Sequence, residues 1–98
     1  MLHVGIVGPP DAISRHALAI GSLPDLRISG RWITHGDQET ATHADTGISH
    51  LSPLPIAHSA DALIVAGQGG FCSRLAVTAL KAGRPVFLYP SVIESVGD

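Results

Sequence analysis

The sequence predicts an α/β fold, a Rossmann-like three-layer domain with a mostly parallel sheet of roughly five strands in the order 3-2-1-4-5. Two observations predict it. Apolar segments with the length of strands alternate with segments of helical periodicity along the chain. A glycine-containing turn follows the first and the last-but-one of the long strand-like segments, as at the carboxyl ends of parallel strands. With a chain of 98 residues we expect a single domain, residues 1–98.

The first third of the chain has the pattern of a β-α-β unit. Residues 2–8 are apolar apart from His3 and end at a Gly-Pro-Pro turn, which predicts a strand buried on both faces. A helix is expected to begin at Asp11 and to end at Gly21. Its buried face is formed by Ile13, His16, Ala17 and Ile20. The β-branched and aromatic side chains of residues 26–33 predict the second strand.

The middle of the chain has a weaker pattern. Residues 35–46 are polar, with a short helix expected near residues 38–44, and residues 48–51 suit a brief strand. Pro53 and Pro55 argue against a regular helix between them, because proline lacks the N–H group that a helix interior needs.

The last third has the pattern of a second strand-helix-strand unit. Residues 62–66 are entirely apolar and predict a buried strand, which the glycine-rich loop 67–70 follows. Residues 73–82 have helical periodicity, and Gly83 suits the position just after the helix end. Residues 85–89 predict the last strand.

Composition narrows the classes of partner and location. The net charge is −2, so we expect neither a nucleic acid nor a membrane surface as a partner. No apolar run approaches the ~20 residues that a membrane span needs. The single cysteine, Cys72, excludes an internal disulfide, and the N-terminus lacks the basic region of a signal peptide. These features predict a cytoplasmic protein.

Three loops are expected at one edge of the sheet. In parallel sheets, ligands bind outside the carboxyl ends of the strands, at the point where the strand order reverses. The loops that follow the predicted strands there are 8–11, 34–35 and 67–70.

Two stretches of the chain resemble one enzyme family. Residues 4–8 continue without a gap into a helix and the turn Leu23-Pro24-Asp25, and residues 60–66 are followed by a Leu-Ala-Val-Thr-Ala-Leu-Lys-Ala-Gly-Arg-Pro-Val run over 75–86. Both resemble the N-terminal NAD(P)-binding domain of the glucose-fructose oxidoreductase, inositol dehydrogenase and rhizopine-catabolism (Gfo/Idh/MocA) family. The resemblance covers essentially all 98 residues. It implies the nucleotide-binding half of a two-domain oxidoreductase, without the C-terminal substrate domain.

The resemblance also implies a binding site for NAD or NADP. Its residues are expected to be Gly8, Pro9, Pro10, Asp11, Ala12, Ile13, Thr34, His35, Gly67, Gln68 and Gly69. The chain departs from the family at important positions: Pro10 and Ile13 replace two glycines of the phosphate loop, and Ile33 replaces the acid that binds the ribose. The family's catalytic lysine has no counterpart in Leu88-Tyr89-Pro90-Ser91, so no catalytic residue is expected.

Other candidate chemistry has a plainer explanation. His35, His43, His50 and His58 lie in predicted loops, where their spacing defines no common face, so no metal site is expected. Cys72 lacks a neighbouring His or second Cys and fits a small buried side chain better than a nucleophile.

These observations leave three functions open. The leading prediction is a stand-alone, non-catalytic module for nucleotide binding or assembly, with an adenine nucleotide as ligand. The alternatives are an NAD(P)-dependent oxidoreductase subunit that needs a partner substrate domain, and a structural oligomerisation domain without a ligand. Because the family's first domain packs on a second one, we expect exposed apolar surface here to be covered in a homodimer.

Overall fold

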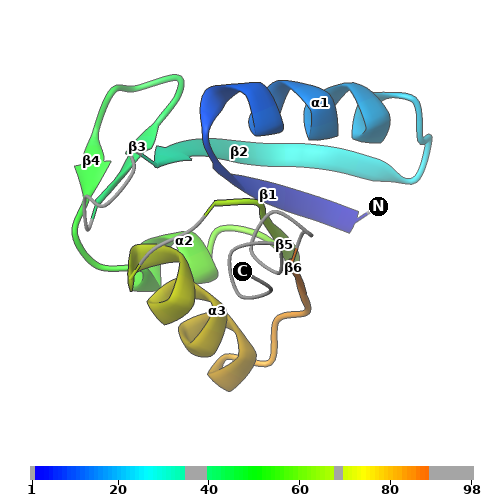
Figure 1. The fold of residues 1–98 in the computed structure, drawn as a ribbon. Coiled ribbons are helices and arrows are strands. Elements are labelled where there is room, and N and C mark those ends of the chain that lie inside the picture. The colour runs from blue at the N-terminus through cyan, green and yellow to red at the C-terminus, as the bar shows by residue number, and fades with distance from the viewer. Residues whose placement is uncertain (1, 35–39, 68–69, 89–98) are drawn as a thin grey trace, which may run out of the picture.

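The structure is a computed structural model that describes residues 2–34, 40–67 and 70–88. It is an α/β fold with a mixed sheet of the order β4-β3-β2-β1-β5-β6 (Figure 1). The elements in chain order are β1 (Leu2–Gly8), α1 (Pro10–Gly21), β2 (Leu26–Thr34), β3 (Ala41–His43), β4 (Ser49–His50), α2 (Leu54–Ala57), β5 (Ala62–Val65), α3 (Gly70–Lys81) and β6 (Val86–Leu88).

The prediction of a mostly parallel, five-stranded sheet in the order 3-2-1-4-5 is wrong. Strands β2, β1, β5 and β6 are parallel, but β3 and β4 form an antiparallel hairpin beside β2, which makes the six-stranded sheet mixed. Only residues 35–40 separate β2 from β3, too few for the crossover of roughly a dozen residues that a parallel neighbour requires. Gly47, at φ 73°, closes the hairpin turn.

Two further predictions for the middle of the chain need correction. Residues 41–43 are a strand, where a helix was expected near residues 38–44; residues 38 and 39 lie outside the described part. The two prolines permit one helical turn, α2, because Pro53 is its N-cap and Pro55 lies in its first turn, where an N–H has no helical acceptor.

The long helices begin close to their predicted positions. Pro9 is the N-cap of α1, and Pro10 precedes the expected start at Asp11. Helix α3 begins at Gly70, three residues before the expected start at residue 73. Gly83, at φ 78°, follows the end of α3 as predicted, and its N–H donates to the Leu80 carbonyl.

The helices cover the two faces of the sheet unequally. Helix α1 lies on one face, while α2 and α3 lie on the other (Figure 1). The core under α1 contains Val4, Ile6, Ile13, Ile20 and Ile64. The larger core under α2 and α3 contains Val7, Trp32, Ala41, Ile56, Ala57, Ala60, Leu63, Val65, Phe71, Cys72, Leu75 and Ala79. In the described part of the chain, no helix is long and apolar enough to span a membrane.

Two glycines make room for the indole ring of Trp32 in this larger core. Gly5 of β1 and Gly30 of β2 are partners in the sheet, next to a register irregularity after Val4. A Cβ atom on Gly30 would lie 2.4 Å from Cη2 of Trp32, and one on Gly5 would lie 3.0 Å from Cζ3 of the same ring. The ring therefore occupies the space that side chains at these two positions would fill.

Candidate functional site

The carboxyl ends of β1, β2 and β5 lie side by side, at the end of the sheet where the sequence predicts a nucleotide site. The structure brings three predicted residues together there. A Cβ atom on Gly67 would lie 2.8 Å from Oγ1 of Thr34 and 3.3 Å from Cα of Gly8. His35, Gln68 and Gly69 lie outside the described residues.

The two glycines at this edge have a packing role. A Cβ atom on Gly8 would lie 3.2 Å from the backbone of Ala66 and Gly67, so the ends of β1 and β5 approach too closely for a side chain there. Thr34 is buried, and its hydroxyl lies against Gly67. Close backbone packing is thus sufficient to explain glycine at both positions.

Cys72 of α3 packs against Gly67 at the carboxyl ends of these strands. A Cβ atom on Gly67 would lie 2.9 Å from its Sγ. Burial raises the pKa of the Cys72 thiol, and a hydrogen bond with the backbone of Gly67 opposes that shift only in part. The thiol therefore stays protonated near neutral pH, as in a small buried side chain rather than a nucleophile.

The start of α1 has few free N–H groups that could bind an anion. Pro9 and Pro10 have no N–H, and the N–H of Ile13 donates to the Pro9 carbonyl at 3.0 Å. The amides of Asp11 and Ala12 remain without a side-chain cap. The carboxylate of Asp11 is exposed in the same turn, where it complements the helix dipole itself and repels a phosphate. Ala12 and Ile13 have buried side chains that pack under the helix.

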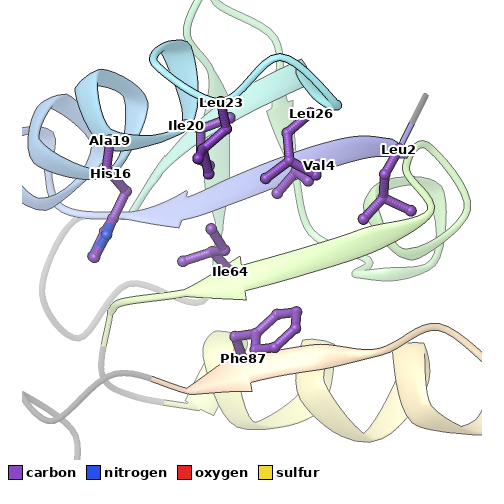
Figure 2. A pocket seen from close by; sticks show the side chains of 9 residues that line it. All are labelled: Leu2, Val4, His16, Ala19, Ile20, Leu23, Leu26, Ile64 and Phe87. Atoms are coloured by element: carbon purple, nitrogen blue, oxygen red, sulfur yellow. The ribbon is translucent and has the colours of Figure 1, made fainter.

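A second candidate site is an apolar groove beside α1, which Figure 2 shows at close range. Its volume is about 390 Å³, and it lies on the α1 face of the sheet, over β1, β5 and β6. Buried Val4, Ile20 and Ile64 form its floor, whereas Phe87, which is 57% exposed, lies at its outer end. The lining residues are Leu2, Val4, His16, Ala19, Ile20, Leu23, Leu26, Ile64 and Phe87.

The groove has one titratable side chain among these residues. Burial lowers the pKa of His16 from its ordinary value of 6.5, and the neighbouring Arg15 guanidinium lowers it further. The imidazole is therefore neutral at pH 7. The sequence predicted His16 on the buried face of the helix, and the structure places it in the wall of the groove (Figure 2).

Sequence reasoning missed this groove. The available signal was the number of elements, because two long helices and one short helix were predicted, too few to cover both faces of a five-stranded sheet. The face of β6 that carries Phe87 has no helix over it in the described part of the chain.

The described residues contain no group of three or more His, Cys, Asp or Glu side chains able to hold an ion.

Comparison with known proteins gives no match to a family model, to a curated protein or to a solved structure. The resemblance to the Gfo/Idh/MocA oxidoreductases, and the NAD or NADP site that it implies, therefore stay predictions.

Proposed function

We propose that the chain is a Rossmann-like, non-catalytic assembly module that forms a homodimer through the apolar groove beside α1. The observation that carries the proposal is the groove itself, over part of which no helix of the described residues lies. Phe87 and Leu23 are 57% and 49% exposed at the margins of this hollow, whose floor is buried and apolar. Apolar side chains exposed around a concave apolar surface are a feature of protein interaction sites.

A second copy of the chain fits this groove better than a charged partner. None of the lining residues is Lys, Arg, Asp or Glu, so the surface has no charge pattern for an oppositely charged partner to match. With a net charge of −2, two copies repel each other only weakly. Phe87 of β6, the last strand of the described sheet, extends the apolar surface to the outer end of the groove.

Light scattering across a concentration series tests the proposal. We expect a dimer for the wild type and a monomer for Leu23→Asp, which places a carboxylate in the groove. Leu18→Asp is the matched control, because Leu18 of α1 is 79% exposed and lies outside the groove; this variant should dimerise like the wild type. A monomeric wild type would contradict the proposal. If deletion of residues 89–98 also destabilised that monomer, the groove would be assigned to that segment of the chain instead.

The adenine-nucleotide alternative has less support. Two amides at the start of α1 favour it, but the Asp11 carboxylate and the closely packed Gly8 and Gly67 oppose it. Calorimetric titration with NAD, NADP, ADP and AMP decides between the two functions. The assembly proposal expects no heat of binding at millimolar ligand, and a saturable signal that Asp11→Asn strengthens would restore the nucleotide function.

A further inference from the structure

His16 is the one ionisable side chain among the described residues that line the groove beside α1. Its side chain is partly buried within a single chain. Figure 2 shows the imidazole at the end of the groove opposite Leu2, where it extends from α1 toward the sheet. The imidazole is therefore part of the surface that a second copy covers in the proposed dimer.

The described surroundings of this imidazole disfavour its protonated form. Burial lowers the pKa of His16, and the Arg15 guanidinium on the same helix lowers it further. The nearest acids along the chain, Asp11 and Asp25, are exposed and do not line the groove. Strands β1, β5 and β6 and the chain between α1 and β2 contribute only apolar lining side chains, which are Leu2, Val4, Leu23, Leu26, Ile64 and Phe87.

Covering the groove makes protonation of His16 still less favourable. A second copy removes water from the groove, and loss of water disfavours the charged form of an imidazole. The surface of the second copy that is buried there is itself apolar in the proposed dimer, so it does not replace the lost hydration of a charge. The dimer therefore binds protons at His16 more weakly than two separate chains do, and acidification shifts the equilibrium toward separate chains.

We infer that the homodimer dissociates on acidification, because His16 allows the groove to be covered only while its imidazole is neutral. The inference rests on the proposed dimer and adds its regulation by pH. Each dimer contains two of these imidazoles. Its dissociation constant therefore rises by up to about a hundredfold for each pH unit below the pKa of His16 in the single chain. At pH 7.5 the imidazole is neutral, and the dimer has its full affinity.

Sedimentation velocity at pH 7.5 and pH 5.0 tests this switch through the dimer dissociation constant. For the wild type we expect the constant to be at least about tenfold higher at pH 5.0. His16→Gln keeps a polar side chain that cannot take up a proton, so its constant should change by less than about threefold. His58→Gln is the matched control, because His58 is exposed at the C-cap of α2 and outside the groove. This variant should keep the pH dependence of the wild type.

Circular dichroism at both pH values checks that the chains stay folded, so that a lower mass reports dissociation. The switch is overturned if the wild-type dissociation constant is the same at both pH values. It is also overturned if His16→Gln keeps the pH dependence of the wild type. Either result with a wild-type dimer at pH 7.5 leaves the proposed function in place, whereas a wild type that is monomeric at pH 7.5 overturns both.

Discussion

The two halves of the α1 face of the sheet differ in what covers them. Over β1 and β2, helix α1 buries Val4 and Ile6 against Ile13 and Ile20. Over β5 and β6 the same face ends at Phe87, which is 57% exposed. The opposite face of β5 is buried under α2 and α3. The comparison shows that apolar strands can specify a sheet without specifying its cover, since no helix of the described residues lies over Phe87 on this face.

Truncating one side chain on each face of the β5–β6 region should give the largest contrast in stability. Leu63 of β5 is fully buried under α2 and α3, so Leu63→Ala should lower the free energy of unfolding by about 2–5 kcal/mol. Phe87→Ala, measured by urea unfolding at concentrations where the chain is monomeric, should change it by about 0.5 kcal/mol or less. Similar losses in both variants would mean that Phe87 is covered within one chain.

The close packing of the covered face should not tolerate an added methyl group. Gly30→Ala places a Cβ atom 2.4 Å from the Trp32 ring, which is enclosed in the core, and should cost about 1–3 kcal/mol. Gly21→Ala is the control, because a Cβ atom there meets nothing within 4 Å. It should be neutral or stabilising by about 0.5–1 kcal/mol, because alanine suits a helix better than glycine does. Equal effects in urea unfolding would contradict the packing role of Gly30.

The smallest expected effect is a pH dependence from His16 in the groove wall. Burial and Arg15 lower its pKa in the folded protein below the ordinary value of 6.5. As the pH falls through 6.5, the unfolded chain therefore binds the proton before the folded protein does, and the free energy of unfolding decreases. The stabilisation that depends on neutral His16 is complete above that pH. Urea unfolding of wild type and His16→Gln at pH 7.5 and 5.5 checks this. The free energy of unfolding should fall less between pH 7.5 and pH 5.5 for His16→Gln than for the wild type. An equal fall in both proteins would show that His16 is not the source of the pH dependence.

The local pattern of the sequence predicted much of the fold. Strands β1, β2 and β5, helix α1 and most of α3 follow from apolar runs and helical periodicity, and Gly83 marked the end of α3. The brief strand predicted at residues 48–51 is confirmed by β4. Its hairpin partner β3 was missed because a strand of three residues is too short to show alternation. Helix α2 was missed because Pro53 and Pro55 were weighed as interior residues rather than as residues of a first turn.

The candidate sites were predictable to different degrees. Topology predicted that Gly8, Thr34 and Gly67 would share one edge, and they do. Their role in nucleotide binding stays a prediction, since close packing alone accounts for the glycines. The groove depends on which elements lie over β5 and β6, a tertiary property that no local pattern of residues 86–88 contains.

The most direct test of dimerisation through the groove is the mass in solution of two variants that place a charge on opposite faces of the sheet. By light scattering, wild type and Val77→Asp should be dimers, because Val77 on α3 lies away from the groove. Phe87→Asp should be a monomer with an unchanged circular dichroism spectrum, because it places a charged carboxylate at the outer end of the apolar groove. A folded Phe87→Asp that stays dimeric, or a wild type that is monomeric at every concentration, would contradict the account.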